Sequence, residues 1–231
     1  SEEWNFEEFQ RSPFLFDGGD NYLSISDYTL SNAFFEKLFW LIRDCYPYED
    51  SRAMAFYGRL YERYIQDLTR EATQKKYTYI DEFTIGKPGH ESKSSDVYLQ
   101  KGSKLLAVEA KGFSVLSNVM ASNRDVEKNN RKMFIDPILE VDKFAEKATK
   151  AGERFSGIEV IFAVAVSMDS INANPYYYED IIREIEEKKV CSRVRYFFNF
   201  SIEEYEMLMS VAEKGVDIFP LLQEYFEESV L

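Results

Sequence analysis

The hydrophobic and polar positions along the chain predict alternating helices and strands. Apolar side chains recur at helical spacing over residues 31–46, 52–75, 136–151, 176–189, 201–213 and 217–228. Strand-like stretches cover 77–85, 95–100, 104–111, 158–166 and 194–200, and the run 158–166 is apolar enough to be buried on both faces. This order of elements favours an α/β fold with a mixed central sheet flanked by helices.

Turn-forming residues separate the predicted strands. The segment 86–92 (GKPGHES) has the composition of a turn, and Gly102-Ser103 predicts a short hairpin between 95–100 and 104–111. Within the helix 52–75, one apolar stripe is predicted to face the core. It consists of Tyr57, Leu60, Tyr61, Tyr64, Ile65 and Leu68.

Composition supports a folded domain. Of the 231 residues, 45% are hydrophobic and 16% aromatic, which excludes a disordered acidic chain. Two cysteines are too few for a disulfide framework, and no apolar run reaches the length of a membrane span, so we expect a cytoplasmic protein that does not enter the membrane. The first residue is not Met, and we expect the chain to be excised from a longer one.

The formal net charge of −13 argues at first against a nucleic-acid partner. The acidity lies in the flanks, however. Residues 1–50 hold 11 acidic and 3 basic side chains and residues 201–231 hold 8 and 1, which leaves residues 51–200 with a net charge of +2. We therefore expect three parts, an acidic helical extension over 1–50 packed on the core, a core over 51–200 and C-terminal helices over 201–231.

Charged residues interrupt two neighbouring strands of the core. On the strand 104–111, side chains alternate between faces, so Glu109 and Lys111 share the face of Leu105 and Ala107. Asp96 lies within the preceding strand 95–100, and antiparallel neighbours are about 5 Å apart, so its carboxylate is expected to meet Glu109. Two converging carboxylates repel unless a proton or a divalent cation neutralises them, and Mg²⁺ prefers such oxygen ligands. The alternative from the residues alone is an ion pair on an edge strand that deters aggregation.

Ser95-Asp96, followed by Glu109-Ala110-Lys111 on the next strand, resembles the motif of the PD-(D/E)xK nuclease superfamily, with Ser95 in place of the name-giving Pro. The resemblance covers about residues 55–200 and implies a restriction-endonuclease-like fold. It implies a metal-dependent endonuclease that hydrolyses DNA phosphodiester bonds, with a role in restriction or other defence against foreign DNA.

The resemblance also implies roles for single residues. Asp96, Glu109 and the carbonyl group of Ala110 would hold Mg²⁺ or Mn²⁺, and Lys111 would position the attacking water. Glu62 on the preceding helix would bind the metal directly, through water or at a second metal. On the helix after the third strand, Lys143 or Lys147 would contact substrate.

Other substrate contacts and other functions remain open. The polar stretch 122–133 contains Arg124 and Lys128, which either touch phosphates or lie in a solvated loop. A single histidine, His90, argues against zinc sites and Ser-His-Asp triads. The competing functions are a catalytically silent binding or assembly module and an RNA nuclease on the same scaffold. A homodimer or additional subunits would suit cutting of both strands.

Overall fold

The computed structural model describes residues 14–19, 21–24, 26–27, 30, 45–47, 51–73, 76–112, 128, 131–168 and 175–229. The chain divides into two compact units, Ser1–Phe56 and Tyr57–Leu231. In the first unit, β1 (Phe14–Phe16) pairs antiparallel with β2 (Tyr22–Ser24). The predicted helix 31–46 lies outside the described residues.

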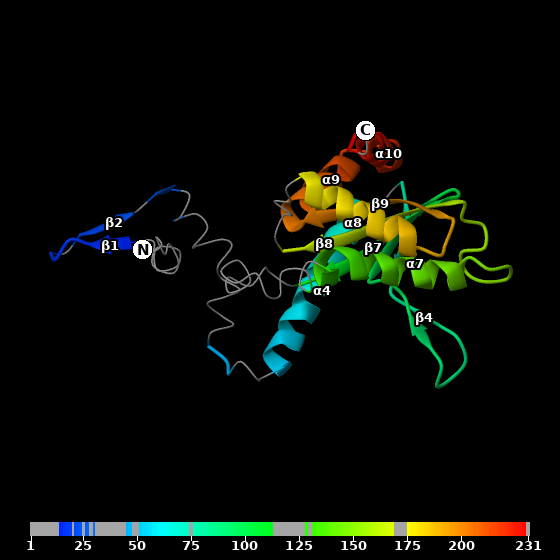
Figure 1. Cartoon of the computed structure of the whole chain (residues 1–231), viewed down its shortest axis with the longest axis horizontal. Coiled ribbons are helices and arrows are strands. Elements are labelled where there is room, and N and C mark those ends of the chain that lie inside the picture. The colour runs from blue at the N-terminus through cyan, green and yellow to red at the C-terminus, as the bar shows by residue number, and fades with distance from the viewer. Residues whose placement is uncertain are drawn as a thin grey trace. The chain divides into compact units, whose positions relative to one another are not determined.

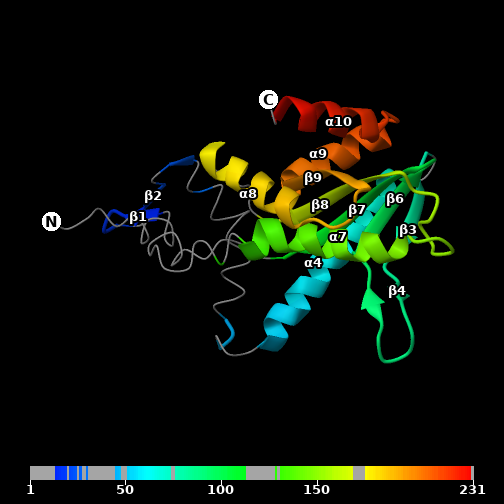
Figure 2. The ribbon, with the colours of Figure 1, turned by 45° about the vertical axis from the view of Figure 1, so that its right-hand side comes forward.

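The second unit is built on a five-stranded sheet in the order β3-β6-β7-β8-β9 (Figures 1 and 2). These strands are β3 (Thr78–Asp81), β6 (Val97–Lys101), β7 (Lys104–Lys111), β8 (Val160–Ser167) and β9 (Val194–Ser201). The pairs β3–β6 and β6–β7 are antiparallel, whereas β7–β8 and β8–β9 are parallel. The predicted mixed central sheet is therefore confirmed.

Helices cover both faces of this sheet (Figure 2). The helices are α4 (Ser51–Ala72), α7 (Asp136–Ala148), α8 (Pro175–Lys188), α9 (Ile202–Glu213) and α10 (Ile218–Ser229), and a π-helical turn, η1 (Arg131–Ile135), leads into α7. Leu105 and Ala107 pack in the core with α7 and α8, while Leu106, Val108 and Ala110 pack in the core with α4, α9 and α10. This division confirms the predicted alternation of side chains along β7.

The predicted strand 77–85 is wrong as one continuous element. It ends at Asp81, and Thr84–Ile85 forms β4, which pairs with β5 (Ser92–Lys93) in a separate two-stranded hairpin that projects from the main sheet (Figures 1 and 2). The break has a packing cause. The ring of Phe83 lies 5.5 Å from the rings of both Phe144 and Phe155, and its backbone N–H donates to Ser94 Oγ at 2.8 Å instead of to a strand partner.

The predicted apolar stripe of α4 is wrong in part, because Leu60 and Tyr64 are exposed. The buried line runs through Tyr61, Ile65 and Thr69, at intervals of four residues. Thr69 tolerates burial because its hydroxyl bonds to the carbonyl oxygen of Ile65 and lies 2.7 Å from the Tyr205 hydroxyl. The contact with Tyr205 of α9 thus allows a polar residue at a buried position that the apolar pattern does not include.

Candidate functional site

The hairpin of β6 and β7 brings Asp96 beside Glu109. Gly102, with φ of +61°, and Ser103 form its two-residue turn, and Lys101 pairs with Lys104. The register then pairs Val97 with Val108. Asp96 precedes Val97, and its backbone N–H donates to the carbonyl oxygen of Val108 at 3.1 Å. The sequence prediction that Asp96 meets Glu109 across the ladder is consistent with this register.

The carboxylate of Asp96 is held by the next strand. Its Oδ2 accepts a hydrogen bond of 2.8 Å from the backbone N–H of Ala110, and the residue is 3% exposed. Burial raises the pKa of Asp96 to about 6, since the N–H of Ala110 offsets the burial cost only in part and the charge of Glu62 adds to it. Burial, followed by the charge of Asp96, raises the pKa of Glu109 to about 7, against the lowering effect of Lys111.

Lys111 links Glu109 to a third acid. Its Nζ lies 3.1 Å from Glu109 Oε1 and 3.1 Å from Glu140 Oε2. Burial alone would lower the pKa of Lys111, but the two carboxylates outweigh burial and raise it, so the ammonium group is charged at neutral pH. Glu140 was not predictable from the sequence, because Asp136, Asp142 and Glu146 lie on the same helix and only the fold distinguishes among these acids.

Glu62 lies near this group without joining it. It is half-buried on α4, and its charge raises the pKa of Asp96. Gly112 permits close packing of α4 after β7, because a Cβ there would lie 3.2 Å from the Cβ of Tyr61. Among the residues that the structure describes, no three acidic, histidine or cysteine side chains converge closely enough to hold a metal ion.

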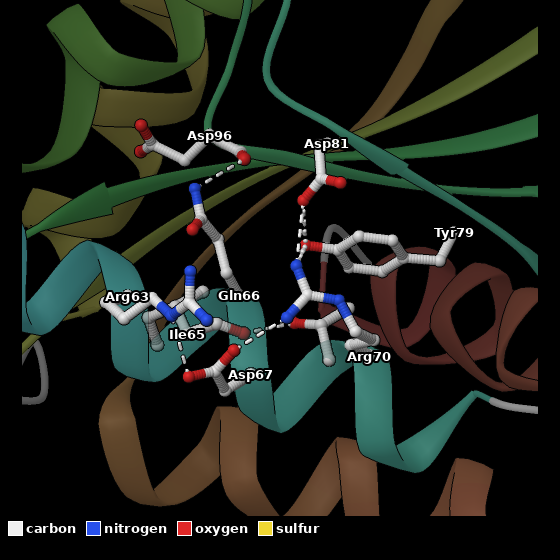
Figure 3. A network of polar contacts seen from close by, with 9 residues as sticks. Arg63, Ile65, Gln66, Asp67, Arg70, Tyr79, Asp81 and Asp96 are labelled. Carbon is white, nitrogen blue, oxygen red and sulfur yellow. Dashed lines mark hydrogen bonds and ion pairs between the residues drawn. The ribbon is translucent and has the colours of Figure 1, made fainter.

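The backbone around Asp96 is fixed from two sides. Gln66 of α4 donates to the carbonyl oxygen of Asp96 at 3.2 Å, and the carboxyl group points away from Gln66 (Figure 3). The backbone N–H of Ser95 donates to the hydroxyl of Tyr98 at 2.9 Å. A proline at position 95 has no N–H to donate, so serine adds an anchor at the position where it departs from the motif.

A polar network continues along α4 from Gln66, with Arg70 at its centre (Figure 3). Arg70 donates to Asp67 at 2.7 Å and to Asp81 at 2.9 Å, and Tyr79 donates to the same Asp81 oxygen at 2.9 Å. These contacts tie α4 to the edge strand β3. They hold the helix that carries Glu62 and Gln66 in place against the sheet.

The other predicted site residues are the substrate contacts Lys143, Lys147, Arg124 and Lys128. Lys143 and Lys147 on α7 line a cavity of about 310 Å³ that Glu109 and Glu140 also line. Lys128 is exposed, and Arg124 lies outside the described residues. His90 is exposed in the β4–β5 hairpin. The structure therefore brings the two lysines of α7, but not His90, to the wall of a cavity beside the carboxylates.

Comparison with known proteins finds a distant similarity to a solved structure. No protein-family model matches the sequence, and no curated protein matches it significantly. Among solved structures, the chain is similar to the small subunit of a heterodimeric restriction endonuclease, with a TM-score of 0.41 and 11% identity over 74% of this chain and 81% of that chain. In the described part of the chain, no helix is long and apolar enough to cross a membrane.

Proposed function

We propose that this chain is a metal-dependent nuclease that hydrolyses DNA phosphodiester bonds at the group Asp96, Glu109 and Lys111. The observation that carries the proposal is the pairing of a buried carboxylate, Asp96, with a half-buried one, Glu109, both with raised pKa, and with an ammonium group 3.1 Å from Glu109. Such perturbed groups are concentrated at functional sites. The net charge of +2 over residues 51–200 is compatible with a polyanionic substrate, because the acidity of the chain lies in its flanks.

The residues suit a divalent cation. Asp96 and Glu109 repel each other in a buried setting, and a cation between them would remove that cost. Asp96, Glu109 and the carbonyl group of Ala110 would hold Mg²⁺ or Mn²⁺, with Glu62 acting through water or at a second ion. When bound, the cation would acidify water and stabilise negative charge on the phosphate oxygens.

Lys111 supplies a positively charged side chain beside the two carboxylates. Its ammonium group is held between Glu109 and Glu140, and there it would orient water and offset charge that develops on the phosphate. A catalytically silent binding module is the second candidate, and the observation that favours it is the lack of a three-acid cluster among the described residues.

The test is a cleavage assay with Lys111→Ala and Asp96→Asn on double-stranded DNA, single-stranded DNA and RNA, each with Mg²⁺ or Mn²⁺. Lys150→Ala, purified in the same way, is the control, because Lys150 is exposed and does not line the cavity. We expect loss of at least 100-fold in both site variants and none in the control. Undiminished cleavage by both site variants contradicts the proposal, and cleavage of RNA alone corrects the substrate.

Calorimetry separates the enzyme from the silent module. Mn²⁺ binding that disappears in the Asp96→Asn/Glu109→Gln variant supports the enzyme, because carboxylate oxygens are the ligands that hard cations prefer. If wild-type protein binds no divalent cation, the silent module is favoured.

A further inference from the structure

The β4–β5 hairpin leaves the main sheet as a projecting ribbon (Figures 1 and 2). Its two strands pair over two residues each, and every residue from 86 to 91 is exposed. A two-stranded hairpin is only marginally stable in water by itself, so this ribbon depends on contacts at its base. An ordered element that contributes residues 86–91 to no core is available for contact with another molecule.

The base of the hairpin is anchored beside the candidate site. The ring of Phe83 packs against aromatic side chains of the core, and its carbonyl oxygen accepts the backbone N–H of Ser94 at 2.8 Å. On the other strand, Ser92 accepts a hydrogen bond of 2.8 Å from Lys147 of α7. Ser92 and Ser94 line the same cavity as Glu109. The hairpin therefore starts at the wall of the site and is fixed there.

The hairpin tip (residues 87–90) is a tight turn of defined geometry. The backbone N–H of His90 donates to the carbonyl oxygen of Lys87 at 2.9 Å, with Pro88 and Gly89 between them. Gly89 has a φ of +85°, and proline followed by glycine at positive φ is the arrangement of a type II turn. Below the tip, a Cβ at Gly86 would lie 2.6 Å from the carbonyl oxygen of His90. The shape of the tip thus depends on glycine at both positions.

Two side chains that donate hydrogen bonds flank this turn. Lys87 and His90 are its first and fourth residues, whose Cα atoms lie less than about 7 Å apart in a β-turn. Both are exposed, and Lys87 makes no ion pair with a residue that the structure describes. An ammonium group and an imidazole N–H are both donors to phosphate oxygens and base edges. The acid nearest in sequence is Glu91, which opposes an anion there.

We propose that the hairpin tip enters the major groove of duplex DNA, where Lys87 and His90 contact the duplex away from the scissile phosphate. Strands of a ribbon lie about 5 Å apart, and the major groove, about 12 Å wide, admits a two-stranded ribbon. The seven residues from Gly89 to Asp96 span at most about 25 Å, which is the length of about seven base pairs. The identity of the ligand rests on the proposed function.

This geometry selects a duplex over a single strand. A ribbon needs a groove to enter, and only a duplex holds a second segment at a fixed offset from the scissile phosphate. The rigid base and the tight tip keep that offset constant, so little order is lost when the duplex binds. The hairpin thus specifies double-stranded DNA as the substrate of the neighbouring site.

The test compares duplex and single-stranded DNA in EDTA, so that binding is measured without cleavage. Anisotropy of a labelled, A·T-rich 20-base-pair duplex and of one of its strands is followed at 50 mM NaCl with the full chain. Lys87→Ala/His90→Ala removes both donors, whereas Gly86→Ala keeps every charge and distorts the tip. Lys150→Ala is the control, because Lys150 is exposed and lies outside the hairpin and the cavity. Circular dichroism verifies that each variant is folded.

We expect Lys87→Ala/His90→Ala to bind the duplex about tenfold more weakly than wild type, and the single strand within about twofold of it. Gly86→Ala should weaken duplex binding at least about threefold, because the donors lose their positions. Glu91→Gln should strengthen duplex binding, since it removes a negative charge beside the phosphates.

Two outcomes overturn the hairpin proposal. One is duplex binding by Lys87→Ala/His90→Ala equal to that by Lys150→Ala, and the other is an equal loss on duplex and single strand. Saturating netropsin, which occupies the minor groove, should leave the difference between this variant and wild type unchanged. Loss of the difference in netropsin overturns the assignment to the major groove.

Cleavage of the duplex by the same preparations in Mg²⁺ separates this proposal from the nuclease. Wild type that binds the duplex through Lys87 and His90 but does not cleave it overturns the nuclease and supports the hairpin. Cleavage by wild type, with Lys87→Ala/His90→Ala binding and cleaving like Lys150→Ala, overturns the hairpin and supports the nuclease. A wild-type protein that neither binds nor cleaves the duplex overturns both.

Discussion

Asp96→Asn should make the metal-free protein more stable at alkaline pH while abolishing cleavage. Burial raises the pKa of Asp96 from 3.8 to about 6 and that of Glu109 from 4.5 to about 7. Because both values lie above those of the unfolded chain, the stabilisation that comes from protonating the pair is fully present below about pH 4 and is lost as the pH rises through 6 and 7. At pH 8 the folded protein therefore carries two unfavourable buried charges.

The size of the effect follows from the pKa values. One pKa unit corresponds to about 1.4 kcal/mol, so ionisation of Asp96 costs the folded state on the order of 3 kcal/mol. An asparagine at this position carries no charge, and its side-chain oxygen still accepts the N–H of Ala110. We expect the free energy of unfolding of Asp96→Asn to exceed that of wild type by about 3 kcal/mol at pH 8 and by about half of that at pH 5.

Urea denaturation followed by circular dichroism, in EDTA at pH 5 and pH 8, measures both differences. Glu187→Gln removes an exposed carboxylate and should change stability by less than about 0.5 kcal/mol at either pH. Replacement of EDTA by Mn²⁺ at pH 8 should raise the urea midpoint of wild type but not of Asp96→Asn. The reasoning is refuted if Asp96→Asn is no more stable than wild type at pH 8.

Three further changes probe other parts of the fold. Glu140→Ala should lower the cleavage rate about tenfold, because Lys111 loses the hydrogen-bond acceptor at Glu140 Oε2. Glu140→Gln keeps an acceptor oxygen and should recover most of the rate in the same assay. Equal rates for all three proteins would contradict this role. Phe162→Ala should lower the free energy of unfolding, measured in urea, by about 3–5 kcal/mol. The buried ring of Phe162 has its centroid 4.7 Å from that of Tyr196 and 5.0 Å from that of Phe219. A loss below about 1 kcal/mol would contradict this, since it would mean that neighbouring side chains fill the cavity. Ser201→Ala should lower the free energy of unfolding by about 1 kcal/mol and the melting temperature with it, because the side chains of Ser201 and Glu204 each accept the backbone N–H of the other at the start of α9. An unchanged melting temperature would contradict a stabilising role of this cap.

The strands of the core were predictable because their signals are local. The bounds 104–111 agree with β7, since side-chain alternation and the turn at Gly102-Ser103 act within a few residues. The same register predicted that Asp96 would lie opposite Glu109. The burial of residues 161–166 was also predictable, because β8 lies between two parallel neighbours and needs apolar side chains on both faces.

Contacts between distant segments were not predictable. Phe83 ends β3 because Phe144 and Phe155, more than 60 residues away, provide a site for its ring. Glu140 reaches Lys111 only because α7 packs on the face of β7 that carries that lysine. No periodic pattern distinguishes this acid from the others on its helix, because periodicity records which face is buried and not what that face meets.

The chain's local pattern thus specifies the elements, the mixed sheet and the adjacency of Asp96 to Glu109, because neighbouring residues in a hairpin share one register. The packing of α7 and the β5–β6 segment around that pair depends on the whole fold. It gives Lys111 a second carboxylate and places Lys143 and Lys147 along one cavity. These contacts depend on which buried and charged groups the fold brings together, and the spacing of residues along the sequence does not specify them.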